Sequence, residues 1–400
     1  ASYPATATRH PRSWCTDDKV WSQRHVHRYD RLGFPPMTKK VQVVGAPPMV
    51  QRPPATQESD SEAEAPHESE HIDGHGDDEE HGDDEEHGDD DMDELMSAFE
   101  DDETDLDLTH LRIKSTKNMH LARFHDTLVR LVLRQNEIRS MRGKDLGAVP
   151  HLQELDLYDN AIEHISGLEN NLELEILDLS FNNIRHVSRV SHLPRCHTLY
   201  LVQNKIAHIR PTDLQPPIAW SLRSLELGGN RLRSLENLSH LINLEELWVG
   251  KNKITSLQGI APLTKLRVLS IQSNRLTKLE GLETLTALEE LYLSHNGIKK
   301  LENLEHNTQL TTLDFCANQV TTIEHVRHLS RLSQFWANDN LITDLNHLDA
   351  HLGPQYMPHL DTVYLEGNPG QKSEGANYRR KVQLALPQIA QLDATLVRRS

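Results

Sequence analysis

The chain has few cysteines, with only Cys15, Cys196 and Cys316 among its 400 residues. Small secreted domains depend on a larger set of paired cysteines, so this count predicts a reducing compartment rather than a disulfide framework. The sequence also lacks any run of about 18 apolar residues, the length that a membrane-spanning helix needs. No apolar signal-peptide core stands at its start. We therefore expect neither a membrane span nor a secretory signal.

Basic residues are absent from one long segment, residues 58–107, which holds 26 Asp and Glu and no Lys or Arg. The first 57 residues instead carry nine basic and three acidic residues. Residues 108–400 are nearly neutral, with 33 basic and 31 acidic residues, so the net charge of −18 is local. The overall acidity therefore says little about what the folded part of the chain binds.

Two N-terminal zones lack the periodicity of folded structure. Residues 1–57 mix Pro and Arg with scattered aromatic residues and show no sustained hydrophobic period, so we predict a basic, disordered segment. Residues 58–105 are acidic and of low complexity, with HGDDEE at 75–80 and again at 81–86. Dense like charges repel one another, and too little apolar surface is available to offset the entropy of ordering. We predict disorder in this tract as well.

The acidic tract contains one motif of the metalloprotease type, His67-Glu68-Ser69-Glu70-His71. Zinc proteases need both histidines on one face of a buried helix, with the glutamate beside the metal-bound water. This copy lies among charges and has no apolar face to bury, so we interpret the match as chance. The histidines and carboxylates of the tract could bind a divalent metal weakly, but we predict no designed metal site and no cofactor.

A repeated pattern, L-x-x-L-x-L-x-x-N, dominates the rest of the chain. Seven of the ten intervals between its asparagines are 22 residues long. A degenerate copy with Leu106, Leu108 and Leu111 precedes the others. A period of 20–29 residues with this consensus is typical of leucine-rich repeats. The asparagines of the eleven regular copies are Asn136, Asn160, Asn182, Asn204, Asn230, Asn252, Asn274, Asn296, Asn318, Asn340 and Asn368.

This repeat predicts an α/β solenoid over residues 106–368, a curved leucine-rich-repeat array of about 11–12 repeats with a concave parallel sheet. Each L-x-L forms a short strand whose leucines point inward, and neighbouring copies stack to make one core. We expect each asparagine to bond backbone groups in the turn after the strand, because buried polar groups need partners. The 26- and 28-residue intervals contain prolines and predict loops on the rim or convex side.

Residues 369–400 break the period and predict a C-terminal capping segment. The pattern from Tyr378 to Leu386 favours a helix, and Pro387 ends it. The alternative is a partner-binding helix. The residues expected to cover the open end of the core are Val382, Leu384, Ala385, Ile389 and Leu392.

The middle residue of each L-x-L points onto the concave face, because side chains alternate along a strand. Five of these eleven residues are aromatic, four are acidic and none is basic. Exposed aromatic rings are typical interface anchors, so the row predicts a protein partner with basic patches. The alternative is that rings merely suit a β surface and pack on each other. The row consists of Val132, Asp156, Asp178, Tyr200, Glu226, Trp248, Ser270, Tyr292, Asp314, Trp336 and Tyr364.

Other function classes find little support in the sequence. The acidic concave face argues against nucleic acid, which demands Lys and Arg. The chain has no P-loop, dinucleotide fingerprint or G-x-S-x-G motif, so we predict that it is not an enzyme. Cys196 replaces a repeat leucine and is interpreted as a core residue, whereas Cys316 is a candidate for exposure on the concave side. The array histidines are interpreted as solvent-facing variation: His151, His164, His192, His240 and His328.

Several strings resemble the leucine-rich-repeat regulatory subunit of protein phosphatase 1. They are LWVGKNKITSLQGIAPLTKLRVLSIQSNRLTKLEGLETLTALEELYLSHNGI (247–298), FWANDNLI (335–342), TVYLEGNP (362–369) and YRRKVQLALPQIAQLDATLVR (378–398). The resemblance covers residues 105–400 and includes strand, loop and cap segments.

The resemblance implies a non-catalytic regulator or scaffold that grips the phosphatase catalytic subunit on the concave face. It further implies a place in the nucleus and cytoplasm, a role that includes mitosis, and possible assembly with a third regulatory protein. Most phosphatase partners dock through a basic–Val–x–Phe peptide, which this chain lacks, since KVQVV at 40–44 has no aromatic. The predicted binding residues are Asp178, Tyr200, Glu226, Trp248, Tyr292, Asp314, Gln334, Trp336 and Tyr364, with Gln334 standing where the family has an acid.

Two other classes use the same fold. An acidic leucine-rich nuclear protein would bind histones or other basic proteins, although such proteins usually carry the acidic tail at the C-terminus and have fewer repeats. A cytoskeletal or ciliary adaptor would also use 22-residue repeats. Dependence of binding on the acidic tract, or on the concave face, distinguishes these classes.

Overall fold

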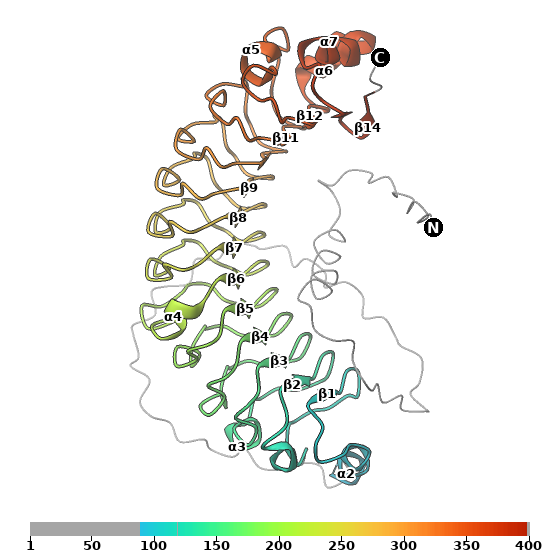
Figure 1. Cartoon of the computed structure of the whole chain (residues 1–400), viewed down its shortest axis with the longest axis vertical. Coiled ribbons are helices and arrows are strands. Elements are labelled where there is room, and N and C mark those ends of the chain that lie inside the picture. The colour runs from blue at the N-terminus through green and yellow to red at the C-terminus, as the bar shows by residue number, and fades with distance from the viewer. Residues whose placement is uncertain (1–88, 118, 398–400) are drawn as a thin grey trace, which may run out of the picture.

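The computed structural model of the chain describes residues 89–117 and 119–397. These residues form one curved solenoid whose strands line the concave side (Figure 1). The predictions for residues 1–57, for residues 58–88 and for the His67–His71 motif lie outside the described residues. The α/β solenoid predicted from the repeat is confirmed.

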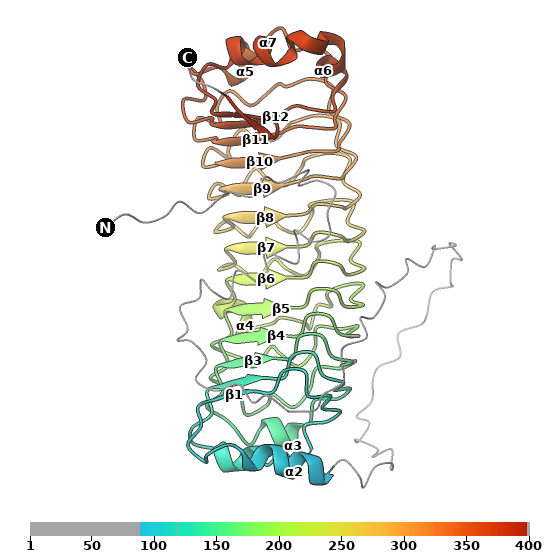
Figure 2. The same cartoon turned by 90° about the vertical axis from the view of Figure 1, so that its right-hand side faces the viewer.

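One sheet of 14 strands runs the length of the solenoid, and its strands follow chain order from β1 to β14. All neighbouring strands pair in parallel except β13 and β14, which are antiparallel. Figure 2 shows the strands stacked as rungs, with the parallel strands all beginning on the same flank. The strands are β1 Asp105–Asp107, β2 Arg130–Val132, β3 Glu154–Asp156, β4 Ile176–Asp178, β5 Thr198–Tyr200, β6 Ser224–Glu226, β7 Glu246–Trp248, β8 Val268–Ser270, β9 Glu290–Tyr292, β10 Thr312–Asp314, β11 Gln334–Trp336, β12 Thr362–Tyr364, β13 Gln391–Leu392 and β14 Thr395–Leu396.

Helices are short and lie at the ends or on the outer side of the array (Figure 1). The two longer repeat intervals hold α4 and α5, in agreement with loops on the rim or convex side. The helices are α2 Asp89–Ser97, η2 Leu121–Phe124, α3 Gly143–Leu146, α4 Ile218–Ser221, α5 Leu348–Leu352, α6 Pro369–Glu374, η3 Gly375–Asn377 and α7 Tyr378–Ala385.

The repeat leucines form a single continuous core. Leu291 on β9 and Leu293 just after it are fully buried, and Ile298, Leu301 and Leu304 of the same repeat close the core from the opposite side. The middle residue of each strand pairs with the middle residue of the next, as Leu291 does with Leu269 and Leu313. Equal register over the whole array lets every turn bury the same leucine positions against its neighbour.

The repeat asparagines hold the turns that follow the strands. Asn252 accepts a hydrogen bond from the backbone N–H of Leu232 at 2.9 Å and donates to the carbonyls of Leu227 and Val249, both at 3.0 Å, and Gly250 at 3.2 Å. The preceding residue, Lys251, has φ of 54°. This left-handed conformation recurs before every regular repeat asparagine and turns the chain off the strand. The structural role predicted for the asparagines is confirmed.

The N-terminal end of the core is covered by α2, so the prediction of disorder up to residue 105 is wrong for its last part. Met96 and Phe99 are buried in the core, with Met92 and Leu95 packed against it. These four apolar residues recur at helical spacing within an otherwise acidic sequence, which gives the helix one face to bury. Arg123 fixes the segment by donating to the carbonyls of Met96 at 2.9 Å and Phe99 at 2.8 Å.

The C-terminal end is covered by α7 and the turn after it. Val382, Ile389 and Leu392 are buried as predicted, but Leu384 is 73% exposed. Leu384 lies on the outer side of α7, where a helix of this length cannot turn all of its apolar residues toward the core. The hairpin of β13 and β14 was not predicted, because its strands are only two residues long.

Candidate protein-binding surface on the concave face

All nine predicted binding residues lie on the sheet strands from β4 to β12, and all at positions that alternate with buried core residues. Eight occupy the last position of a strand, and Gln334 occupies the first position of β11. The ladder register makes them neighbours: Asp178, Tyr200, Glu226 and Trp248 pair in sequence across β4 to β7. Tyr292, Asp314, Trp336 and Tyr364 pair likewise across β9 to β12, and Ser270 of β8 joins the two groups. The structure therefore brings the nine residues onto one face.

Four aromatic rings form a continuous row on this face. The ring centroids of Trp248 and Tyr292 are 6.2 Å apart and nearly parallel, with 24° between the ring planes. The row continues from Tyr292 to Trp336 at 6.4 Å and from Trp336 to Tyr364 at 6.1 Å. Trp248 and Tyr292 lie two strands apart, and the small Ser270 between them leaves room for the rings to lean together. Ring contacts at these distances are favourable.

The rings are less exposed than the sequence predicts. Tyr200, Trp248 and Tyr292 are 8%, 9% and 6% exposed, whereas Trp336 and Tyr364 are partly exposed. None of the first three belongs to the core cluster, so they are concave-face residues rather than core residues. One cause of the low exposure is the contact between rings, which a concave sheet favours because it draws neighbouring side chains together. Four of the five rings therefore contact one another, as the alternative to partner binding also expects, and partner binding stays a prediction.

Two of the rings donate hydrogen bonds to glutamates at the first position of their own strands. The indole N–H of Trp248 donates to the Glu246 carboxylate at 3.2 Å, and the Tyr292 hydroxyl donates to Glu290 at 2.6 Å. Gln334 replaces the carboxylate at the equivalent position beside Trp336. Among the described residues, the buried indole Nε1 of Trp336 has no hydrogen-bond partner. A buried donor without an acceptor is costly.

The acids of the row are buried and use part of their hydrogen-bonding capacity within the chain. Asp178 accepts from the backbone N–H of Ser180 at 2.8 Å, and Asp314 accepts from that of Cys316 at 3.0 Å. Burial raises the pKa of Asp314 above its ordinary value. Burial, together with repulsion from Asp178, raises the pKa of Asp156 to about 8, although Arg134 lies 3.0 Å away. The negative charge of the row is therefore smaller than its composition suggests.

Asp156 predicts a pH dependence of stability. Its pKa of about 8 in the folded chain lies above the ordinary 3.8, so folding favours the protonated form. The stabilisation is complete below about pH 4 and is lost as pH rises to about 8, by at most ~1.4 kcal/mol per pH unit. We expect Asp156→Asn to be more stable than the native chain at pH 8 and to lose most of this slope. Urea unfolding between pH 4 and pH 8 measures how the free energy of unfolding changes with pH. Asp126→Asn, at an exposed position, is the control. Equal pH dependence in Asp156→Asn and the native chain would contradict the raised pKa of Asp156.

The cysteines and histidines have structural contacts. Cys196 is a core residue as predicted, and burial raises the pKa of its thiol to about 12. Cys316 is also buried, so its predicted exposure is wrong; its thiol lies 2.6 Å from Asn338 Oδ1. Asn338 stands one turn further along the array and covers the thiol.

Three of the array histidines are not simple surface variation. His192, His240 and His328 are partly buried, and the Nε2 atom of each contacts a backbone carbonyl one repeat earlier, at 2.8–2.9 Å. A carbonyl accepts hydrogen bonds, so each Nε2 carries the proton. These histidines join neighbouring turns on the outer half of the array. The sequence did not indicate this, because the acceptors are backbone atoms.

Within residues 89–117 and 119–397, no group of three or more His, Cys, Asp or Glu is placed to hold a metal ion. No helix in this part of the chain has the length and apolar character needed to cross a bilayer.

Comparison with known proteins supports the fold along much of the array. A family model described as "Leucine Rich repeats (2 copies)" matches residues 220–262 and 264–306, and one described as "Leucine rich repeat" matches residues 126–184. An internalin from Listeria monocytogenes aligns with a TM-score of 0.57 at 23% identity, over 75% of this chain and 88% of the internalin. The leucine-rich repeat domain of APL1B aligns with a TM-score of 0.55 at 22% identity, over 69% of this chain and 86% of that domain. These structures show the fold alone.

Curated relatives are similar over shorter segments. The protein phosphatase 1 regulatory subunit SDS22 of Schizosaccharomyces pombe is 44% identical over 62 residues, which is 16% of this chain and 18% of that protein. Its namesake in Saccharomyces cerevisiae is 43% identical over 81 residues, 20% of this chain and 23% of that protein. The human protein phosphatase 1 regulatory subunit 7 is 64% identical over 39 residues, 10% of each chain. The chain thus matches less than a quarter of the length of each of these relatives. Over the matched segments, the resemblance to phosphatase regulatory subunits is confirmed.

Proposed function

We propose that this leucine-rich-repeat protein, which is similar in part to regulatory subunits of protein phosphatase 1, is itself a non-catalytic regulator of that phosphatase. It binds the catalytic subunit through the concave face and modulates its assembly, localisation or activity. It acts in the nucleus and cytoplasm, including at mitosis, and a third regulatory protein can join the complex. The observation that supports the concave face most directly is the nine-residue row on neighbouring strands.

The chemistry of the row suits a protein partner. Aromatic side chains supply most of the binding energy in many interfaces, and they cluster near the interface centre. Trp248, Tyr292, Trp336 and Tyr364 form such a cluster, joined by ring contacts of 6.1–6.4 Å. A rigid row of this kind loses little conformational freedom on binding, which favours affinity.

Binding of the purified phosphatase catalytic subunit to the full chain tests the proposal. Tyr364 is partly exposed, and its hydroxyl accepts a hydrogen bond from Gln391 at 2.8 Å. We expect Tyr364→Ala to weaken binding roughly 10–100-fold, as loss of an aromatic anchor does. Gln334→Glu should act in the opposite direction, because its carboxylate can accept the Trp336 N–H and thereby order the ring. Isothermal titration calorimetry measures both changes.

Phe181→Ala is the matched control, because Phe181 is an exposed aromatic residue outside the row. Unchanged affinity in Tyr364→Ala, or an equal loss in Phe181→Ala, would contradict binding through the concave face. Retention of histones that depends on residues 58–105 would favour the acidic nuclear class, and capture of tubulin alone would favour a cytoskeletal adaptor. Phosphatase activity on a protein substrate, measured with and without the chain, gives the direction of regulation.

A further inference from the structure

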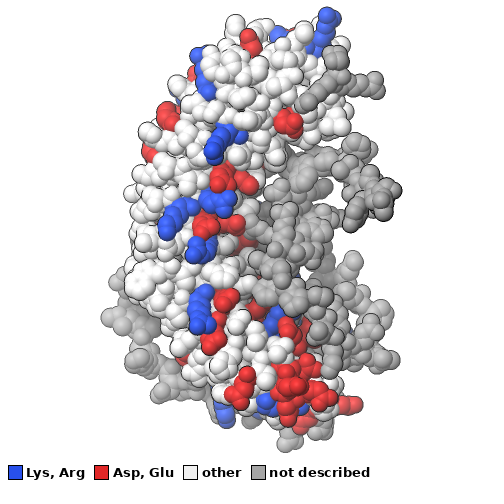
Figure 3. All heavy atoms as spheres, viewed as in Figure 1, with Lys and Arg blue, Asp and Glu red and all other residues white. Residues whose placement is uncertain are grey.

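The flank on which the strands begin carries a row of alternating charges. Arg223, Glu245, Arg267 and Glu289 stand immediately before β6, β7, β8 and β9, one per turn. Arg223 Nη1 lies 2.6 Å from Glu245, and Arg267 binds both carboxylate oxygens of Glu289, at 3.0 and 2.8 Å. Blue and red side chains alternate along this flank in Figure 3. All four side chains keep about a third or more of their surface exposed, so the row remains available to a partner.

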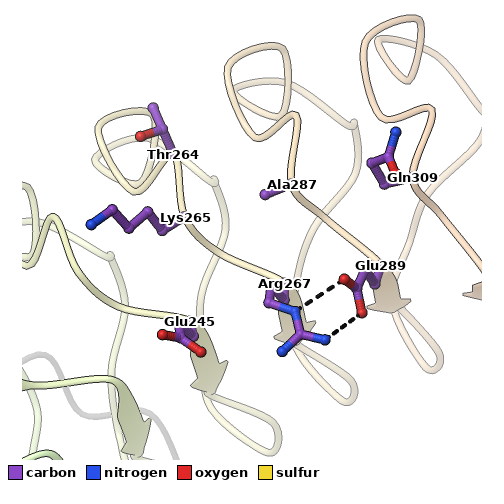
Figure 4. A pocket seen from close by; sticks show the side chains of 7 residues that line it. All are labelled: Glu245, Thr264, Lys265, Arg267, Ala287, Glu289 and Gln309. Atoms are coloured by element: carbon purple, nitrogen blue, oxygen red, sulfur yellow. Dashed lines mark hydrogen bonds and ion pairs between the residues drawn. The ribbon is translucent and has the colours of Figure 1, made fainter.

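Beside this charge row lies an exposed apolar residue and, further along, a hollow. Trp220, three residues before Arg223, is 63% exposed on α4. The hollow has a volume of about 450 Å³ and lies among the turns before β7 to β10, with Ala287 and Gln309 on its outer part (Figure 4). Tryptophan is among the side chains most often found as anchors at the centre of protein interfaces. The charge row and the tryptophan together form one surface, which we call the strand-start flank.

We propose that the strand-start flank binds a second copy of this chain in an antiparallel homodimer. The two-fold axis lies in the contact plane, perpendicular to the solenoid and between β7 and β8. Rotation about this axis reverses the order of the turns along the solenoid. The charge row of one copy still faces the charge row of the other. Arg223 of each copy then faces Glu289 of the other, and Glu245 faces Arg267. The row of four reads base, acid, base, acid in one copy and acid, base, acid, base in the reversed copy. Every basic residue therefore meets an acid.

The charge pattern selects this register over its neighbours. An axis through β7 would place Arg223 opposite Arg267 and Glu245 opposite itself. An axis between β6 and β7 would keep an Arg223–Glu245 contact, but it would place Glu175, which stands before β4, opposite Glu289, and His197 opposite Arg267. An axis between β8 and β9 keeps the Arg267–Glu289 contact but sets Arg223 and Glu245 against uncharged residues. Like charges in contact cost affinity, so complementarity favours a single arrangement.

The same register also gives complementary contacts outside the four-residue charge row. It carries Trp220 of one copy to Thr286 and Ala287 of the other, the edge of the hollow. Nearer the ends, Glu173 before β4 faces Arg331 before β11, which adds a further opposite-charge contact. A ring seated in the hollow would supply the apolar anchor that exposed ion pairs alone do not.

Both concave faces remain open in this dimer and point the same way, since the axis runs from the convex to the concave side. Two partner molecules could therefore be held side by side. The homodimer itself does not depend on the proposed phosphatase partner.

Two charge reversals in the full chain test the contact. Arg267→Glu places two acids opposite each other at both symmetric positions, and Glu245→Arg places two bases there. We expect each variant alone to dimerise roughly a hundredfold more weakly than the native chain. An equimolar mixture of the two variants restores opposite charges at both contacts, since the acid introduced at position 267 of one variant then faces the base introduced at position 245 of the other. Sedimentation velocity at about 50 mM salt, where screening is weak, measures the dissociation constants.

Lys278→Glu is the control, because Lys278 lies in the same repeat as Arg267 but follows the strand. It should leave dimerisation unchanged. Trp220→Ala should weaken it at least about tenfold, as loss of an aromatic anchor does. Circular dichroism shows whether the variants are folded, and recovery in the mixture is itself proof that they are. A native chain that stays monomeric, or a mixture that does not recover, would overturn the homodimer.

Discussion

Replacing Asn252 with aspartate is expected to lower the free energy of unfolding by roughly 3–5 kcal/mol, the cost of breaking a buried polar cluster. The substitution keeps the shape of the side chain and the oxygen that accepts from Leu232. It replaces the Nδ2 donor with an oxygen that faces the carbonyls of Leu227, Val249 and Gly250. Three acceptors lose their donor, and a carboxylate is buried among oxygens. Urea unfolding followed by circular dichroism measures the change.

Asn377→Asp provides the matched control. Asn377 is exposed and its side chain makes no capping hydrogen bond to α7, so a carboxylate there stays solvated and costs no donor that the fold uses. We expect a change below about 0.5 kcal/mol, as for most surface substitutions. An Asn252→Asp variant as stable as this control would show that the repeat asparagines are dispensable, and the account of the turns would be wrong.

The array could be predicted from the sequence because every repeat buries its leucines and bonds its asparagine at the same positions. Leu291 and Leu293 need a neighbouring turn to bury them, and the asparagine needs the carbonyl of the preceding turn. A period of 22 residues keeps both relations in register. The physical constraint is local and repeated, so it leaves a strong signal that composition alone does not.

The ends of the array left a weaker signal. Three apolar residues of α2 and Phe99 just after it lie among acids, and the charge of the tract outweighed their helical spacing in the prediction. What orders this segment is tertiary: Arg123, 24 residues after Phe99, bonds the carbonyls at the helix end. The hairpin of β13 and β14 similarly depends on pairing with β12. Contacts of this kind cannot be read from a periodic pattern.

At the candidate site, strand alternation correctly predicted the face on which each residue lies, but not its surroundings. Alternation says that Trp248 and Tyr292 point away from the core, and nothing about whether their rings meet over Ser270. Likewise, alternation does not show that the buried Trp336 N–H, beside Gln334, has no hydrogen-bond partner among the described residues. Cys316 was misjudged for the same reason, since Asn338 of the next turn covers it. Lateral packing along the sheet is the missing information.

The double substitution Trp248→Ala and Trp336→Ala should weaken binding of the phosphatase catalytic subunit by at least about a hundredfold. Each ring is expected to contribute about 2 kcal/mol or more as an interface anchor, and about 1.4 kcal/mol corresponds to a factor of ten. Both rings contact Tyr292, so their loss also breaks the row between β7 and β12. We expect the array to stay folded, because neither ring belongs to the core cluster. Calorimetric titration and circular dichroism measure the two effects separately.

Trp220→Ala is the matched tryptophan control, since Trp220 lies on α4 and outside the concave row. Full affinity in this control, together with loss in the double variant, assigns binding to the concave rings rather than to tryptophan in general. Restored affinity in Trp248→Phe with Trp336→Phe would show that an aromatic surface suffices, whereas continued loss would indicate that the indole N–H groups contribute. Unchanged affinity of a folded double variant would place the phosphatase elsewhere on the chain. Unfolding of that variant would instead show that the concave rings hold the turns together, which would give them a structural role and remove the reason to regard them as a binding site.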